Sequence, residues 1–144
     1  MNRIYVAGSL KSPRPREIAN LLRENGHEVF DDWHACGWNA DKECQSYEHE
    51  RGRSFREALK GRFATHGFEF DRMNMEACDI FILVLPAGKS AHMELMYCQG
   101  IGKQGIIYMD DEPAEWDLMY KFVDVIAIGE EELLATLATV IAAT

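Results

Sequence analysis

Three side chains suited to covalent or proton-transfer chemistry, Tyr5, Asp71 and Glu94, are each predicted close to a buried strand. Glu94 is expected in the first turn of the helix after the most hydrophobic strand, where a carboxylate also fits simply as a favourable charge at a positive helix end. Tyr5 is expected in the middle of the first strand, where core packing is the alternative role. Asp71 precedes the hydrophobic strand by one helix and could equally be a solvated or capping carboxylate.

Basic residues are concentrated at the start of the chain. The first sixteen residues carry four basic side chains and no acidic one, although the formal net charge of the protein is -9. Gly8 and Ser9 are expected to leave backbone N–H groups free at the start of a helix, which suits a phosphate or carboxylate group. A solvated loop face is the alternative explanation. The basic residues are Arg3, Lys11, Arg14 and Arg16.

A long polar segment, residues 31–53, contains two tryptophans, two glycines and mixed charges. We expect it to be irregular, and a connection of this length inside a compact domain is usually functional. Trp33, His34 and Trp38 could form a wall on which a nucleobase stacks, or the tryptophans could simply pin the loop. Asp32 and Trp33 are expected among the substrate-binding residues.

Three patterns resemble known motifs but do not fit the structural context of those motifs. Gly100-x-Gly102-x-x-Gly105 has the letters of a dinucleotide-binding loop, yet it would end a helix and precede a strand, so a helix-ending turn is the better interpretation. Gly88-Lys89-Ser90 resembles the end of a P-loop, but the leading glycine would fall on Leu83, inside a strand. Four further residues fit no standard zinc spacing, so no metal is expected: His34, Cys36, Cys44 and His49.

Apolar runs and helical periodicity alternate along the chain, which predicts the elements that position these residues. Such alternation predicts an α/β fold with a five-stranded parallel sheet and helices on both faces. We expect one domain over residues 1–144, of the flavodoxin or Rossmann-like type with strand order 2-1-3-4-5, and a ligand crevice at the carboxyl ends of strands one and three. Strands are expected at 3–8, 28–30, 79–85, 105–109 and 123–128, and helices around 18–22, 55–63, 70–77, 91–101, 116–120 and 130–142.

Composition excludes several classes of protein. A hydrophobic content of 47% argues against disorder, and a pI near 5.0 argues against binding to polymeric nucleic acid or to an anionic membrane. No apolar run approaches the ~18–20 residues of a membrane-spanning helix, and the start lacks the long apolar stretch of a signal peptide. The four cysteines form no C-x-x-C pair, so we expect reduced thiols and a cytoplasmic location.

Three short segments, taken together, are similar to a known family in order and spacing across nearly the whole chain. They are 5–9 (Y-V-A-G-S), Asp71 eight residues before Asp79, and 88–95 (G-K-S-A-H-M-E-L) leading to Gly102-Lys103. Together they resemble the nucleoside 2-deoxyribosyltransferase superfamily, which includes deoxynucleoside 5′-monophosphate N-glycosidases. The resemblance implies that Glu94 is a nucleophile that attacks the anomeric carbon, that Tyr5 orients this carboxylate, and that Asp71 assists proton transfer or binds the sugar.

One departure from the transferase pattern bears on the substrate. Where the transferases carry an aspartate six residues before the nucleophile, this chain has Gly88, followed by Lys89. Ser9 and Lys11 match the residues with which the monophosphate N-glycosidases hold the 5′-phosphate, and Ser90 could join them at the next helix N-terminus. We therefore favour a nucleoside 5′-monophosphate over a nucleoside as substrate.

The resemblance implies cleavage of an N-glycosidic bond or transfer of a base, on a small nucleotide or nucleoside and without a cofactor. The alternative is a non-catalytic nucleotide-binding or sensor module on the same fold, and a more distant one is cleavage of NAD. The family also implies a homodimer or larger homo-oligomer. Exposed side chains around Trp116, Met119 and Tyr120 are candidates for that contact.

Overall fold

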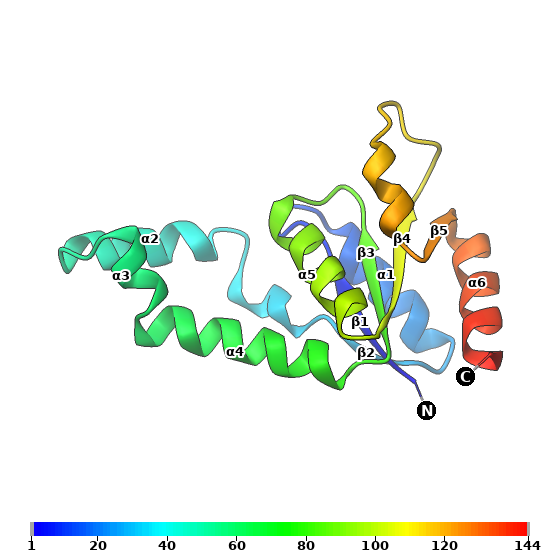
Figure 1. Ribbon diagram of the computed structural model, residues 1–144, viewed down its shortest axis with the longest axis horizontal. Helices are drawn as coiled ribbons and strands as arrows, with labels where there is room; N and C mark the ends of the chain where they lie inside the picture. The colour runs from blue at the N-terminus through cyan, green and yellow to red at the C-terminus, as the bar shows by residue number, and fades with distance from the viewer. Residues whose placement is uncertain (1, 144) are drawn as a thin grey trace.

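Five parallel strands form one sheet in the order β2-β1-β3-β4-β5 in the computed structural model, which describes residues 2–143 (Figure 1). This confirms the expected α/β fold class, its single parallel sheet and the strand order. The two ends of the expected domain, Met1 and Thr144, lie outside the described residues. The strands are β1 (Arg3–Ala7), β2 (Glu28–Phe30), β3 (Ile80–Val84), β4 (Gln104–Met109) and β5 (Val125–Ile128).

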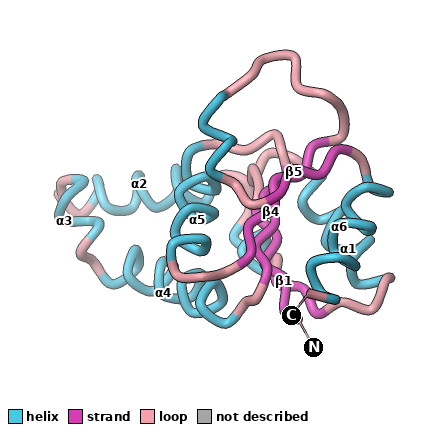
Figure 2. Tube along the Cα trace, turned by 45° about the vertical axis from the view of Figure 1, so that its right-hand side comes forward, coloured by secondary structure: helices cyan, strands magenta, loops and turns pink. Residues whose placement is uncertain are grey.

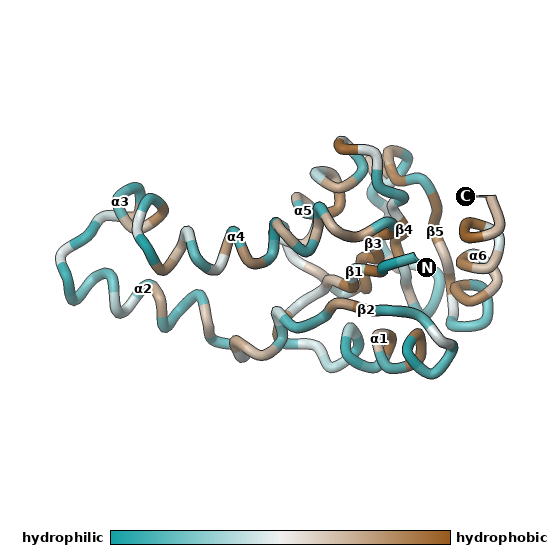
Figure 3. The backbone as a smooth tube through the Cα atoms, turned by 90° about the horizontal axis from the view of Figure 1, so that it is seen from below, coloured by the Kyte–Doolittle hydropathy of each residue, from teal (hydrophilic) through white to brown (hydrophobic). Residues whose placement is uncertain are grey.

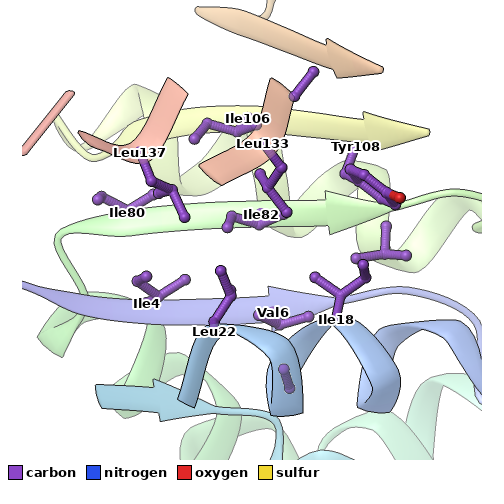
Figure 4. Packing of buried hydrophobic residues seen from close by; sticks show 13 residues of the cluster. Ile4, Val6, Ile18, Leu22, Ile80, Ile82, Ile106, Tyr108, Leu133 and Leu137 are labelled. Atoms are coloured by element: carbon purple, nitrogen blue, oxygen red, sulfur yellow. The ribbon is translucent and has the colours of Figure 1, made fainter. Parts of the chain in front are cut away.

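The central strand β3 is buried along its whole length, as its continuous apolar run predicts. Alternate side chains of the strands point to opposite faces and separate two hydrophobic clusters. One face packs against Ile18 and Leu22 of α1 (Arg14–Glu24) and against Leu133 and Leu137 of α6 (Glu130–Ala142), as Figure 4 shows. These apolar positions three or four residues apart form the buried stripe of each helix.

The opposite face of the sheet is covered by α5 (Lys89–Gly100) and by the end of α4 (Arg62–Ala77) (Figure 2). Leu95 and Cys98 of α5 and Met75 of α4 are buried there beside Phe81 and Leu83. This face carries the candidate catalytic side chains, because Tyr5 belongs to the same cluster.

The polar segment 31–53 is not irregular, which corrects the expectation from its composition. It forms a 3-10 turn, η1 (Asp32–Cys36), and a helix, α2 (Ala40–Glu50), followed by α3 (Phe55–Leu59). Glu48 is the one buried residue of α2, so the helix has no apolar stripe that periodicity could detect. The expected helices at 55–63 and 70–77 are also different: α3 is short, and α4 runs unbroken from residue 62 to 77.

The helices α2, α3 and the first half of α4 extend away from the sheet as an arm (Figures 1 and 3). The α3 helix packs on α4 at the far end of the arm. Ser54 begins α3 with a capping box, in which its hydroxyl accepts from the Glu57 N–H and the Glu57 carboxylate accepts from the Ser54 N–H. A local cap of this kind supports a helix that has little contact with a core.

Three smaller features concern the ends of predicted helices; two of them differ from expectation and one confirms it. The helix α5 begins at Lys89, two residues earlier than expected, so Glu94 lies in its second turn rather than its first. The segment after β4 forms a 3-10 helix, η2 (Leu118–Phe122), which leaves Trp116 outside it. Gly102, at φ 94°, follows the end of α5 and precedes β4, which confirms the helix-ending turn. No helix within residues 2–143 is both long and apolar enough to span a membrane.

Candidate active site

The hydroxyl of Tyr5 donates a hydrogen bond of 3.0 Å to a carboxylate oxygen of Glu94. The two residues are 89 positions apart and meet because β1 and β3 are neighbours and α5 packs on the face of the sheet to which Tyr5 points. The bond engages one of the two carboxylate oxygens of Glu94. The structure therefore brings together two of the three predicted catalytic side chains.

Aromatic rings pack around Tyr5 on the sheet side. Tyr5 is fully buried and stacks on Phe81 with ring centroids 5.0 Å apart and an angle of 13° between the ring planes. Phe30 lies 4.9 Å from Tyr5 on the other side and 5.6 Å from Phe70 of α4. The rings hold the phenol in one orientation and exclude water from it.

Burial is the main influence on the charge of Glu94. It raises the pKa of Glu94 from 4.5 to about 7, the hydrogen bond from Tyr5 opposes that rise, and the charge of Asp71 adds to it. The pKa of Asp71 is itself raised by burial in α4. The charge of Asp71 also raises the pKa of Tyr5, so the Asp71 carboxylate lies within electrostatic reach of both Tyr5 and Glu94. Two carboxyl groups with raised pKa values on one face are suited to acid–base exchange near neutral pH.

The carboxyl ends of β1 and β3 approach each other closely at Gly8. A Cβ atom on Gly8 would lie 2.9 Å from the Val84 carbonyl oxygen and 2.5 Å from the Pro15 ring, so no side chain fits there. Directly after it, the Ser9 hydroxyl accepts a hydrogen bond of 3.1 Å from the backbone N–H of Lys11. This turn brings Ser9 and Lys11 to the carboxyl edge of the sheet, where ligands bind in folds of this kind.

The basic zone expected at the start of the chain is smaller than its composition suggested. Arg14 forms ion pairs with Asp110 at 2.7 Å and with Glu130 at 2.9 Å, and it also bonds Glu17 and the Tyr108 hydroxyl. Arg3 lies at the opposite, amino end of β1, where its side chain pairs with Glu28. The expectation of four available cations is therefore wrong, because acidic residues distant in sequence neutralise two of them.

The remaining cations, Lys11 and Arg16, line a hollow of about 370 Å³ beside the turn at Ser9. His34 and Trp38 form part of its wall, and Trp38 is 66% exposed. The Nε2 atom of His34 is buried without a hydrogen-bond partner among the described residues. Burial first, and the nearby Arg16 second, lower the pKa of His34 and favour its neutral form.

Trp33 is held by the body of the protein instead of lining this hollow. Its indole N–H donates a hydrogen bond of 2.7 Å to the carbonyl oxygen of Val6, and its ring packs on the cluster that contains Tyr5. Of the two roles that the sequence left open, Trp33 thus fits the one that pins the loop, and it does not join Trp38 in lining the hollow. The neighbouring Asp32 is exposed in η1.

Gly88 and Ser90 lie where α5 begins. Gly88 is its N-cap residue, and Ser90 is exposed in the first turn. The backbone N–H groups of a first helical turn lack helical partners and favour an anion. Among residues 2–143, no group of three or more His, Cys, Asp or Glu side chains is arranged to hold a metal ion.

Comparison with known proteins shows a likeness in structure. No family model and no curated protein matches the sequence. The structure is similar to that of the CMP N-glycosidase BcmB from Clostridium botulinum, with a TM-score of 0.52 and 19% sequence identity. The match covers 94% of this chain and 98% of that chain. This likeness establishes the shared α/β fold.

One pair of site neighbours was missed by sequence reasoning. His92 of α5 faces the Gly88 carbonyl through Nδ1 at 2.7 Å and the Tyr120 hydroxyl through Nε2 at 2.9 Å. A carbonyl only accepts, so Nδ1 of the neutral ring carries the proton and Nε2 accepts from Tyr120. Tyr120 is thus half-buried rather than exposed, and it ties η2 to the helix that carries Glu94.

Phe30 and Phe70 are the other residues that sequence reasoning missed. Phe30 is the last residue of β2 and lies at the carboxyl edge of the sheet. Because ligands bind at this edge, the predicted strand order was enough to place Phe30 near the site. Phe70 precedes Asp71 on α4, and its contact with Phe30 depends on the course of the arm.

Proposed function

We propose that this protein cleaves the N-glycosidic bond of a nucleoside 5′-monophosphate through a covalent glycosyl ester on Glu94. The observation that carries the proposal is the hydrogen bond of 3.0 Å from the buried Tyr5 hydroxyl to the Glu94 carboxylate. It fixes one carboxylate oxygen of Glu94, and in the proposed reaction the other oxygen attacks the sugar. Asp71, within electrostatic reach, supplies the second carboxyl group that glycoside chemistry requires.

In the first step, the free carboxylate oxygen of Glu94 forms a bond to C1′ of the sugar as the bond from C1′ to the base nitrogen breaks. The base leaves with the electron pair of that bond and takes a proton from the Asp71 carboxyl, whose raised pKa keeps it protonated to higher pH than a solvated aspartate. The ionised form of Glu94 attacks, and the Tyr5 hydrogen bond favours that form.

In the second step, water attacks C1′ and the ester bond to Glu94 breaks. Asp71, now ionised, accepts the proton of that water, and the starting protonation state returns. A second free base in place of water would give base transfer by the same route.

The phosphate end of the substrate is assigned to the carboxyl edge of β1. Lys11 and Arg16 supply positive charge, and the Ser9 hydroxyl and the first turn of α5 at Ser90 supply hydrogen-bond donors. Asp32, Trp33 and Gly88 complete the proposed substrate-binding set. We expect the protein to act on free nucleotides as a homo-oligomer in the cytoplasm.

Chromatography that measures the free base released tests the proposal. The substrates are ribo- and deoxyribonucleosides, their 5′-monophosphates and NAD. We expect release from a monophosphate by the wild type, and loss of at least ~10³-fold in Glu94→Gln, which keeps the shape of the side chain but removes the nucleophile. If a nucleotide raises the melting temperature of both proteins without turnover, the protein is a nucleotide-binding module. Release of nicotinamide from NAD alone would assign it to NAD cleavage.

A further inference from the structure

The far end of the arm presents apolar side chains to solvent. We call residues 51–63 the arm tip. Phe55, Leu59 and Phe63 are exposed there, and Phe55 retains 75% of its accessible surface. A cluster of large exposed apolar residues at the end of a projecting element marks an interaction surface.

The arm tip is also the most basic stretch of the chain after its start. It has five basic residues and one acidic residue, a net charge of +4 in a protein whose net charge is -9. Arg53 pairs with Glu48, and Arg51 lies over the Tyr47 ring. Within residues 2–143, no ion pair engages the other three cations: Arg56, Lys60 and Arg62.

A second segment has the opposite charge and a similar apolar character. We call residues 110–122 the acidic loop; it has five acidic residues and one basic residue, a net charge of -4. Asp110 is bonded to Arg14, and Asp117 caps η2, but Asp111, Glu112 and Glu115 form no ion pair with any described residue. Its exposed apolar side chains are Trp116, Leu118, Met119 and Phe122.

The arm tip and the acidic loop lie far apart in all three overall views, the first at the end of the arm and the second above the sheet (Figures 1, 2 and 3). The two segments do not touch within one chain, and their net charges, +4 and -4, are opposite in sign. We propose that the arm tip of one copy docks on the acidic loop of a second copy. Apolar side chains form the centre of this contact, and charges of opposite sign surround it.

A single-stranded nucleic acid is the other occupant that a basic arm could attract. The acidic loop in the same chain favours a second copy, because nucleic acid would be repelled by that loop and by the net charge of -9. The exposed Leu59 also favours a protein partner, since an aliphatic side chain offers nothing to a phosphate backbone. The proposal goes beyond the proposed reaction and does not depend on it.

Charge reversal tests the pairing by sedimentation velocity. The arm variant combines Arg56→Glu with Lys60→Glu, and the loop variant combines Glu112→Lys with Glu115→Lys. We expect the wild type to self-associate and each variant alone to associate at least tenfold more weakly, since like charges then face each other. An equimolar mixture of the two variants should regain the wild-type assembly, because the acidic arm of one then meets the basic loop of the other.

Two controls make the result decisive. Glu24→Lys with Glu132→Lys makes the same change in net charge as the loop variant, at exposed sites on α1 and α6, and it should sediment like the wild type. Circular dichroism confirms that each variant is folded. A monomeric wild type, a mixture that stays dissociated, or a control that dissociates as the variants do would overturn the proposal. Binding of a single-stranded oligonucleotide that the arm variant loses, with sedimentation unchanged, would assign the arm to nucleic acid instead.

Discussion

Replacing Glu94 by glutamine should stabilise the protein, and increasingly so as the pH rises. Burial raises the pKa of Glu94 from 4.5 to about 7, so the folded state holds this proton more tightly than the unfolded state. Above pH 7 both states are ionised, and burial of the charge then costs the folded protein about 3 kcal/mol. Below pH 4.5 both states are protonated and the cost vanishes. Glutamine cannot ionise and still accepts the Tyr5 hydrogen bond, so it removes this cost.

Urea denaturation of the wild type and of Glu94→Gln at pH 5 and pH 8 measures this cost. The stability of the variant relative to the wild type should rise by about 2–3 kcal/mol between the two pH values. Effects of the new amide that do not depend on pH cancel in that comparison. Glu132→Gln, an exposed carboxylate on α6, is the matched control and should show no such rise. A relative stability of Glu94→Gln that is the same at both pH values would refute the argument that Glu94 is a buried carboxylate with a raised pKa.

Three further substitutions test other parts of the site. Tyr5→Phe removes the hydrogen bond that lowers the pKa of Glu94, so the rate should fall about 10–100-fold and the acidic limb of the pH–rate profile should move to higher pH. Lys11→Ala should raise KM for a 5′-monophosphate about tenfold or more while leaving that for the matching nucleoside unchanged, as steady-state kinetics would show. Arg14→Ala leaves Asp110 without its ion pair and should lower stability in urea by about 1–2 kcal/mol.

The sheet and the central pair of the site could be predicted because each depends on a strong local signal. The apolar run at β3 and the glycine-ended run at β1 identified two neighbouring strands, and the right-handed crossovers of a parallel sheet restrict their order. Once β1 and β3 are neighbours, Tyr5 and Glu94 come to one face although 89 positions separate them.

The arm and the charge network could not be predicted, because their causes are not local. The α2 helix buries only Glu48, so hydrophobic periodicity carried no signal for it. For Arg14 the sequence left an anion-binding zone and a solvated loop face open, and it carried no sign of the actual partners Asp110 and Glu130, which lie 96 and 116 positions away. For Trp33 the sequence left a stacking wall and a role in pinning the loop open, and only the course of η1 shows that its indole N–H reaches the Val6 carbonyl.

The central claim is that Glu94 forms a bond to the sugar, and mass spectrometry of the trapped intermediate tests it most directly. A 2′-fluoro-2′-deoxynucleoside 5′-monophosphate slows hydrolysis of the ester, because fluorine disfavours the oxocarbenium-like transition state. We predict that the intact protein gains the mass of one fluorodeoxyribose 5-phosphate residue, located on Glu94 by peptide sequencing and absent from Glu94→Gln. Turnover of this substrate without an adduct, or an adduct that persists in Glu94→Gln, would contradict the mechanism.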